Sequence, residues 1–591
     1  MKSLAQLNKY FLKYKWRFLL GIIFVIAQNF LAIYPAQLIR DSLDTVIVSL
    51  KNFKAHPVGS TTLVSVLSDT IFRYLLFIIG IGILRGVIMF MMRQTMIVMS
   101  RLIEYDLKND IYAHYQKLSL AFYRRNNTGD LVNRISEDVT RVRMYIGPAI
   151  MYTINLVALF TLIIIIMFSV NAKLAFYSLL PLPFLSLSIY FVSARMNSKS
   201  EEVQVQQSKL STFVQEAFSG IRVLKSFARE IESGAVFENE SEKYKMKSME
   251  LVKINSMFFP LMLLLVGLST LLVVYIGGQE VIAGNITAGN IAEFIIYVNM
   301  LTWPVAALGW VTAIVQRAAA SQVRINEFLQ TEPEILSNEE NKVVIKGKIE
   351  FRNVSFSYPE SGIKALENVS FVVQPGESLA VLGKTGSGKS TLANLIVRMY
   401  DAVSGKILID DQGIETVSLT TLRANIGYVP QDVFLFSDSI SNNISFGKND
   451  SSESEIEQAA KEAVIYDNIM EFEKNFQTLI GERGITLSGG QKQRVSIARA
   501  LIKNPRILLF DDCLSAVDTQ TEEQILNNLG EQMVGKTSII ISHRVSTVKH
   551  ADHIIVLDAG KVIERGSHDD LLSKGGLYFH LYEKQLAEEE L

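Results

Sequence analysis

A phosphate-binding pattern lies in the second half of the chain, between Gly383 and Ser390. It follows an apolar, strand-like run at residues 378–382 and precedes a helical pattern at residues 391–399, which is the context of a P-loop. Glycines let successive backbone N–H groups converge on phosphate oxygens, and the helix N-terminus adds partial positive charge. Lys389 is predicted to reach the β- and γ-phosphates of a bound nucleotide, and the Ser390 hydroxyl to bind Mg²⁺. The residues of this segment predicted to bind ATP are Gly383, Lys384, Thr385, Gly386, Ser387, Gly388, Lys389, Ser390 and Thr391.

An apolar run at residues 506–510 ends in two carboxylates, Asp511 and Asp512. Carboxylate oxygens suit Mg²⁺, so Asp511 is predicted to hold this ion directly or through water. Asp512 follows at a position where a base could orient water at the γ-phosphate. Surface acids that cap a strand would give the same pattern, but the P-loop upstream favours the catalytic interpretation.

Between these motifs, the residues from Leu487 to Gln491 read LSGGQ and precede a helical pattern that runs to Ile502. A Ser-Gly-Gly turn at a helix N-terminus is a second candidate anion site. One ATP needs only one P-loop. The second phosphate cradle therefore indicates two sites that are shared between two such domains.

The elements that carry these motifs belong to the second of two unlike halves. Residues 1–330 hold 32 Lys/Arg and 21 Asp/Glu, a net charge of +11, whereas the rest of the 591 residues hold 26 and 38, a net charge of −12. We therefore predict one domain at 1–330, a linker at 331–348 and a nucleotide-binding domain at 349–591. The balanced total of −1 argues against a nucleic-acid partner, and a single cysteine excludes a disulfide framework and Cys-based metal sites.

Six apolar stretches in the first half are long enough to cross a bilayer, which needs about 20 residues of helix. The connections between spans two and three and between spans four and five are rich in Lys and Arg. The connections between spans three and four and between spans five and six carry almost no charge. This alternation predicts a multi-pass protein of the cytoplasmic membrane with both termini in the cytoplasm. The predicted spans are Phe18–Ile39, Ile71–Val98, Ile146–Val170, Leu174–Ala194, Ile254–Ala283 and Ile291–Val315.

The two long basic connections keep helical apolar spacing at residues 100–123 and 199–229, so the spans are expected to continue as helices beyond the bilayer. The turns near Gly129 and Gly220 are candidates for short helices that contact the next domain, and ordinary helix turns are an equal alternative. Arg85 lies midway along the second span, where a lipid-facing charge is costly. It is predicted to face a water-filled cavity, and an arginine that snorkels to the interface or is paired for stability is an equal alternative.

Taken together in this order and spacing, the P-loop, the Leu487–Gln491 motif and Asp511-Asp512 resemble the ATP-binding cassette (ABC) transporter family, and the six preceding spans resemble its exporter-type half-transporters. The resemblance implies an N-terminal all-α transmembrane domain of six helices. It also implies a C-terminal α/β P-loop nucleotide-binding domain with a helical subdomain.

Further residue roles are implied by the same resemblance. Tyr358 matches the aromatic residue that stacks on adenine, and Gln431 matches the glutamine that contacts Mg²⁺. Asp518 belongs to the loop that crosses the dimer interface, and His543 matches the histidine that senses the γ-phosphate. Gln431, Asp512 and His543 are thus the expected catalytic group. The residues implied to bind the partner's ATP are Ser488, Gly489, Gly490 and Gln491.

One position departs from the family pattern, because glutamate usually stands where this chain has Asp512. Aspartate is one methylene shorter, and a displacement of about 1 Å can cost about 100-fold in rate. The site is therefore predicted to hydrolyse ATP slowly. This resembles the degenerate half of heterodimeric exporters, so a heterodimer is favoured and a homodimer is the alternative.

The combined reading is ATP-driven export of a small hydrophobic or amphipathic molecule, drug or lipid, by a dimer in the membrane. ATP and Mg²⁺ are the expected cofactors, and a second half-transporter and membrane lipids the expected partners. A nucleotide-gated channel or regulator on the same architecture remains the alternative function, and a peptide the alternative substrate. A soluble ABC ATPase is remote because of the six spans.

Overall fold

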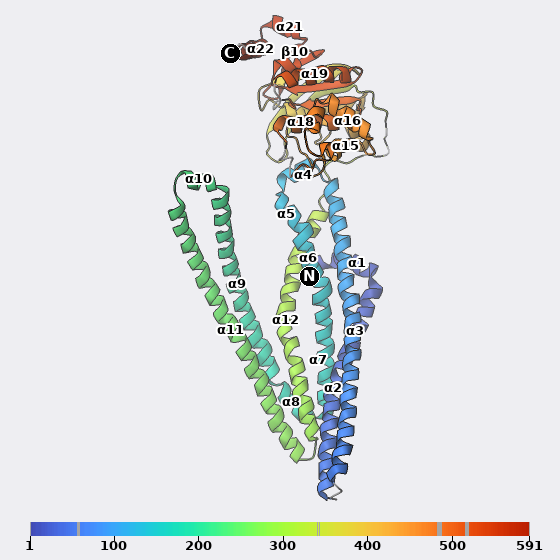
Figure 1. Cartoon of the computed structure of the whole chain (residues 1–591), viewed down its shortest axis with the longest axis vertical. Helices are drawn as coiled ribbons and strands as arrows, with labels where there is room; N and C mark the ends of the chain where they lie inside the picture. The colour runs from blue at the N-terminus through green and yellow to red at the C-terminus, as the bar shows by residue number, and fades with distance from the viewer. Residues whose placement is uncertain are drawn as a thin grey trace. The chain divides into compact units, whose positions relative to one another are not determined.

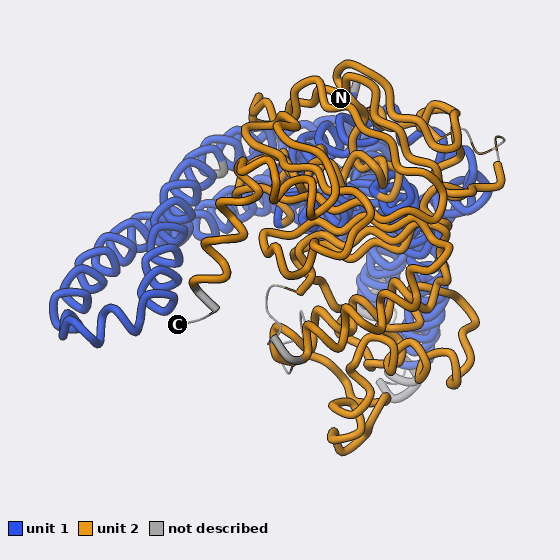
Figure 2. Tube along the Cα trace, turned by 90° about the horizontal axis from the view of Figure 1, so that it is seen from above, with its two compact units in different colours: residues 1–115, 129–331 blue, residues 116–128, 332–591 orange. Residues whose placement is uncertain are grey.

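The computed structural model describes residues 2–55, 60–337, 339, 341, 343–481, 487–514 and 519–589. The chain divides into two compact units, which Figure 2 colours separately. Unit 1 comprises residues 1–115 and 129–331, and unit 2 comprises residues 116–128 and 332–591. The predicted first domain, 1–330, thus contains a segment, 116–128, that groups with the C-terminal unit.

The regular elements of unit 1 are all helices in its described residues, as expected for segments that must satisfy their backbone hydrogen bonds inside a bilayer. The 58 residues of α3 span about 87 Å at 1.5 Å per residue, far more than an apolar core of about 30 Å. Its elements are η1 (Lys2–Leu7), α1 (Asn8–Lys13), α2 (Lys15–Ala55), α3 (Ser60–Lys117), α5 (Thr128–Asn133), η2 (Arg134–Asp138), α6 (Val139–Met144), η3 (Tyr145–Ala149), α7 (Ile150–Val170), α8 (Ala172–Leu179), α9 (Pro181–Ser219), α10 (Ile221–Ser226), α11 (Glu230–Ile282) and α12 (Ala288–Leu329).

Six helical segments among the described residues are long and apolar enough to cross a membrane, and each contains or nearly contains one predicted span. The expected helical extensions are also present, because α9 and α11 run side by side well beyond their apolar parts and are joined by the short α10 (Figure 1). The six segments are Lys15–Lys51, Leu67–Lys117, Thr128–Val170, Ala172–Ser219, Glu230–Ile282 and Ala288–Leu329.

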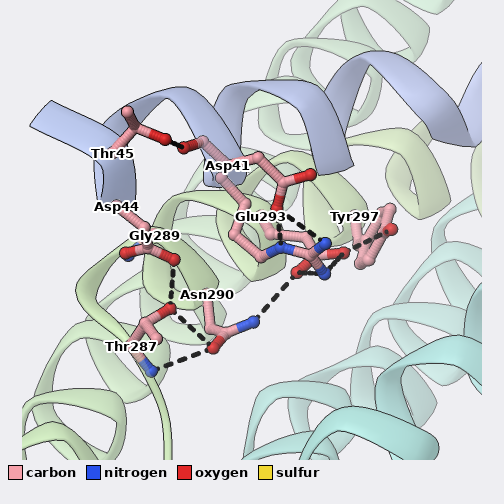
Figure 3. Close-up of polar contacts among 9 residues, drawn as sticks. Asp41, Asp44, Thr45, Thr287, Gly289, Asn290, Glu293 and Tyr297 are labelled. Atoms are coloured by element: carbon pink, nitrogen blue, oxygen red, sulfur yellow. Dashed lines mark hydrogen bonds and ion pairs between the residues drawn. The ribbon is translucent and has the colours of Figure 1, made fainter.

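A polar network joins α2 to the N-terminal end of α12 (Figure 3). The Glu293 carboxylate is fully buried and accepts hydrogen bonds from Arg40 Nη1 at 3.2 Å, Asn290 Nδ2 at 3.1 Å and Tyr297 Oη at 2.8 Å. One turn away, Asp44 accepts from the backbone N–H of Gly289 at 2.9 Å. The two helices approach so closely here that a Cβ on Gly289 would lie 2.5 Å from the Arg40 carbonyl oxygen. The network therefore fixes the spacing and register of two spans that are about 250 residues apart in the sequence.

Unit 2 is an α/β domain with two sheets, as predicted from its alternating strand and helix patterns. The six-stranded sheet has the order β10-β9-β3-β8-β7-β6, with β10 antiparallel and the other strands parallel, and the four-stranded sheet has the order β2-β1-β4-β5. Its strands are β1 (Ile349–Ser357), β2 (Lys364–Val373), β3 (Ser378–Gly383), β4 (Ser404–Ile409), β5 (Gln412–Gly413), β6 (Ile426–Val429), β7 (Ile507–Asp511), β8 (Thr537–Ser542), β9 (His553–Asp558) and β10 (Lys561–Gly566).

The helices of unit 2 pack on these sheets around two main apolar cores. One core lies between the sheets and α13, and the other joins α15, α16 and α18 to β6 and β7 as a helical subdomain. The helices are α4 (Leu120–Arg125), α13 (Lys389–Ile396), η4 (Ile414–Thr416), α14 (Leu419–Ala424), α15 (Ile440–Ser445), α16 (Glu453–Glu462), α17 (Tyr466–Met470), η5 (Asn475–Gln477), α18 (Gly489–Leu501), α19 (Thr519–Met533), α20 (Val545–Val548), α21 (His568–Lys574) and α22 (Leu577–Glu589).

The helix that joins the nucleotide-binding unit from the first half of the sequence is α4, whose Ala121 is buried in the core between the sheets. The expected position near Gly129 was therefore several residues too late, because Gly129 lies in α5 and belongs to unit 1. At the second expected position, Gly220 ends α9 and α10 follows it, so a short helix is present there.

Candidate active site

The predicted nucleotide residues meet at one edge of the six-stranded sheet. The P-loop follows β3, His543 follows β8, and Asp511 ends β7. These three strands are parallel neighbours in the order β3-β8-β7, so their carboxyl ends lie together. In open α/β sheets this edge is where ligands bind.

The P-loop closes on its own lysine. Lys389 Nζ donates hydrogen bonds to the carbonyl oxygens of Gly383 at 2.6 Å and Lys384 at 3.0 Å, and burial lowers the pKa of this ammonium group. Gly388 has a φ of 101°, in the left-handed region, and a Cβ there would lie 2.4 Å from the Ala365 carbonyl oxygen. Only glycine can therefore make this turn into α13, where Lys389 begins the helix.

A cavity of about 410 Å³ opens beside this loop. Tyr358 lines it and donates or accepts a 2.8 Å hydrogen bond between its hydroxyl and that of Thr391. The buried Ser387 hydroxyl has no hydrogen-bond partner among the described residues, which leaves a polar atom in the loop for a ligand. The cavity is lined by Tyr358, Ile363, Lys364, Ala365, Thr385, Gly386, Gly388, Lys389, Ser390, Thr391, Gln431, Asp511, Asp512 and His543.

The metal ligands predicted from the sequence are adjacent in this cavity. Ser390 Oγ donates to Asp511 Oδ1 at 3.1 Å. Asp511 is 2% exposed, and burial raises its pKa to about 6, with the Ser390 hydrogen bond opposing the shift. A buried carboxylate with a hydroxyl beside it is the oxygen donor set that Mg²⁺ prefers, so the residues present fit this ion.

Asp512 stands between the other two residues of the expected catalytic group. Its Oδ1 lies 2.8 Å from His543 Nδ1, and its Oδ2 accepts from Gln431 Nε2 at 3.4 Å. The backbone of Asp512 is in the left-handed region with φ 46°, and its N–H donates to the Ile541 carbonyl oxygen at 2.8 Å. Aspartate tolerates this conformation better than most residues. The turn after β7 thus aims the carboxylate at His543.

The signature residues lie elsewhere in the same unit. Ser488 caps α18 in a reciprocal capping box, in which its N–H donates to Gln491 Oε1 at 2.9 Å and its hydroxyl accepts from the Gln491 N–H at 3.3 Å. Ser488 and Gly489 are exposed, and Gly490 is half-buried. Among the described residues that line the P-loop cavity, the four signature residues Ser488, Gly489, Gly490 and Gln491 are not found. Asp518 lies outside the described residues.

One residue beside the cavity, Arg124 of α4, could not be predicted from the sequence. Its guanidinium carbon lies 5.4 Å from the centroid of the Tyr358 ring, and its Nη1 forms an ion pair with Glu360 at 3.5 Å. Tyr400 extends the aromatic group, with its ring centroid 5.5 Å from that of Tyr358. Arg124 precedes Tyr358 by more than 200 residues, so local patterning held no signal for this contact.

Comparisons with known proteins agree with this geometry. Residues 18–305 match the family model of the ABC transporter transmembrane region, and residues 366–515 match that of the ABC transporter. A probable multidrug resistance ABC transporter ATP-binding/permease protein of Bacillus subtilis, YheI, is 34% identical over 98% of this chain and 97% of its own length. An ATP-dependent lipid A-core flippase of Syntrophus aciditrophicus is 37% identical over 82% of this chain and 81% of its own length.

Among solved structures, a bacterial Atm1-family ABC exporter with ATP bound has a TM-score of 0.77 and 27% sequence identity, covering 98% of this chain and 99% of that chain. The similarity extends over both halves, so the predicted fold class of six spanning helices followed by a P-loop nucleotide-binding domain is confirmed. The chain belongs to the ABC transporter family and is a multi-pass membrane exporter that binds ATP and couples its hydrolysis to transport.

Proposed function

We propose that this chain is one half of a dimeric exporter that moves small amphipathic molecules, drugs or lipids, across the cytoplasmic membrane, with both termini in the cytoplasm. The names of its relatives, which include a multidrug resistance protein and a lipid A-core flippase, support this substrate class. The observation that carries the proposal is the cavity that unites the P-loop, Asp511, Asp512 and His543 in a chain with six apolar spans.

In this proposal the P-loop backbone and Lys389 bind the phosphates of ATP, and Tyr358 stacks on the adenine. Ser390, Asp511 and Gln431 hold Mg²⁺, which supplies charge neutralisation at the β- and γ-phosphate oxygens when it is bound. Lys389 must release its bonds to the Gly383 and Lys384 carbonyl oxygens to reach a phosphate. Without nucleotide, the Lys389 ammonium group thus has backbone carbonyl oxygens of the P-loop as its hydrogen-bond acceptors.

Asp512 is proposed to orient the attacking water, with His543 holding the carboxylate at its other oxygen. The carboxylate is one methylene shorter than the glutamate usual in the family, and it is engaged by Gln431 and His543 at the same time. A base that is displaced by about 1 Å loses about 100-fold in rate. We therefore propose that this P-loop builds the slower of two sites.

The signature residues are proposed to complete the other site, because Ser488 and Gly489 are exposed at the N-terminus of α18 and none of the four lines the chain's own P-loop cavity. In a dimer that closes on ATP, the exposed Ser488 and Gly489 would contact the nucleotide on the partner's P-loop. A different half-transporter with glutamate at the matching position is the favoured partner. A homodimer in which Asp512 is an adequate base at both sites is the alternative.

Reconstitution into proteoliposomes tests this proposal. The chain alone and the chain co-expressed with a neighbouring half-transporter are compared for ATP-driven accumulation of a fluorescent amphipathic dye, with the Lys389→Ala variant as the inactive control. Accumulation against a gradient by the pair, weak for the lone chain and absent for Lys389→Ala, is expected. Equilibration without accumulation would instead indicate a nucleotide-gated channel.

A further inference from the structure

A side chain of the last helix forms two hydrogen bonds with the loop that carries His543. Gln585 of α22 donates from Nε2 to the His543 carbonyl oxygen at 2.8 Å, and its Oε1 accepts from the Val545 N–H at 2.6 Å. One amide group therefore bonds to the peptide groups on both sides of Arg544. Both bonds are used in the orientation that an amide requires, because its nitrogen donates while its oxygen accepts.

The rest of the loop is held by side chains as well. Ser542 Oγ accepts from the Arg544 N–H at 3.0 Å. Glu522 of α19, only 4% exposed, accepts from Arg544 Nη1 and from Thr547 Oγ1, the latter at 2.7 Å. The His543 carbonyl and the N–H groups of Arg544 and Val545 are thus each bonded to a side chain, whereas the His543 side chain is 48% exposed and points to Asp512.

The helix that supplies Gln585 is itself anchored to the sheet. Tyr578 of α22 is fully buried in an apolar cluster with Val545, Val548 and Leu571. Its hydroxyl lies 2.6 Å from His568 Nδ1, and its N–H donates to Glu564 at 3.1 Å. Gln585 therefore reaches the His543 loop from a fixed base, which is what a positioning residue requires.

We propose that Gln585 is a positioning residue that holds the backbone of His543 so that its imidazole meets Asp512 and the γ-phosphate. This inference rests on the role of His543 proposed above. A displacement of about 1 Å at a reacting group can cost about 100-fold in rate, so the two Gln585 bonds matter if they prevent a shift of that size at His543. Gln585 touches neither nucleotide nor water in this account. It acts through His543 alone.

Single-turnover hydrolysis of radiolabelled ATP by the full-length chain in nanodiscs tests the proposal. Gln585→Leu keeps the size of the side chain and removes both bonds, and it should lower the hydrolysis rate about 10-fold or more. The protein concentration for half-maximal single-turnover rate and the affinity for a non-hydrolysable analogue should stay within about 2-fold, because the P-loop is untouched. Gln585→Glu, which keeps the acceptor for the Val545 N–H and loses the donor to His543, should have an intermediate rate.

The matched control is Glu583→Ala, an exposed position on the same helix two residues away, which should hydrolyse ATP like the wild type. Retained binding of the analogue by Gln585→Leu shows that this variant is folded. A Gln585→Leu variant that binds the analogue and hydrolyses at the wild-type rate would overturn the proposal.

A double-mutant cycle separates this proposal from the one on which it rests. If Gln585 acts through His543, then Gln585→Leu should slow the His543→Ala variant by less than about 2-fold. An undiminished further loss in the double variant would show that Gln585 acts by another route. Unchanged hydrolysis by His543→Ala itself would instead overturn the role of His543.

Discussion

Two buried carboxylates, one in each unit, show opposite solutions to the same physical problem. Glu293 in unit 1 is fully buried and accepts hydrogen bonds from Arg40, Asn290 and Tyr297. Asp511 in unit 2 is 2% exposed, accepts from Ser390, and has a pKa raised to about 6 by burial. The Glu293 carboxylate has hydrogen-bond partners within the chain. The Asp511 carboxylate keeps an unfavourable free energy of burial, which a bound cation would offset. The comparison separates a carboxylate that is bonded within the fold from one that is proposed to hold a cation.

The largest expected effect is the loss of ATP hydrolysis when the Lys389 ammonium group is removed. Lys389→Ala removes the ammonium group that is proposed to bind the phosphates, and ATP hydrolysis should fall by at least about 100-fold. The exposed Lys406→Ala is the control, because Lys406 lies on β4 outside the cavity. Steady-state phosphate release by the two variants checks this. Activity of Lys389→Ala within a few-fold of the control would contradict the proposal that this cavity binds ATP through Lys389.

A second test asks whether Glu293 holds the fold. Glu293→Ala leaves Arg40 with Asp41 as its remaining acidic partner at 2.8 Å, and it should lower the free energy of unfolding by about 3 kcal/mol, the lower end of the cost of breaking a buried ion pair. Asp69→Asn breaks an exposed pair with Arg73 on α3 and should cost less than about 1 kcal/mol. Thermal unfolding in detergent compares them. Equal melting temperatures would show that the buried network adds no stability.

Neutralising the buried carboxylate of the active site should change the stability in the opposite direction. Asp511→Asn removes a buried carboxylate whose pKa is raised from 3.8 to about 6 by folding. The nucleotide-free protein should therefore gain about 3 kcal/mol in free energy of unfolding at pH 7. The variant should also lose Mg²⁺-dependent hydrolysis. Asp552→Asn is the contrasting control in unit 2, because hydrogen bonds from Ser378 lower the pKa of Asp552 and its substitution should destabilise the protein. A destabilised Asp511→Asn would place Asp511 with Glu293 as a structural carboxylate.

The dependence on pH follows from the same shift. The folded state binds the Asp511 proton more tightly than the unfolded state does. Ionisation of Asp511 therefore does not lower the free energy of unfolding below about pH 4, and lowers it by the full amount above about pH 6. The stability difference between Asp511→Asn and the wild type should therefore grow as pH rises from 4 to 6 and then level off. Unfolding of both proteins at several pH values measures it, and a difference that shrinks over this window would refute the assignment.

The grouping of the candidate nucleotide-site residues could largely be predicted from the sequence, because these residues belong to short motifs that follow strands. The P-loop after β3 and the acids at the end of β7 meet simply because parallel strands end at one edge. The Arg40–Glu293 pair could not be predicted in this way. Its members lie 253 residues apart, and hydrophobic periodicity says which face of a helix is buried but not which helix it meets. The contacts of Arg124 and Gln585 escaped prediction for the same reason.

The smallest expected effect concerns the close approach of α2 and α12. Gly289→Ala would place a Cβ 2.5 Å from the Arg40 carbonyl oxygen and should cost about 1–3 kcal/mol of stability through overpacking. Gly278→Ala is the matched control, because a Cβ at this helical position in α11 meets nothing within 4 Å. Melting temperatures in detergent distinguish the two variants. A neutral Gly289→Ala would show that the two helices can move apart without loss.

The central claim is that Asp512 makes this chain's hydrolytic site slow because its carboxylate is one methylene too short. The most direct measurement is single-turnover ATP hydrolysis by the purified chain and its Asp512→Glu and Asp512→Asn variants. The account predicts slow hydrolysis by the wild type, a rate at least about 10-fold higher for Asp512→Glu, and only a modest further loss for Asp512→Asn. Robust hydrolysis by the wild-type chain that Asp512→Glu leaves unchanged and Asp512→Asn abolishes would contradict it, because aspartate would then be an adequate base.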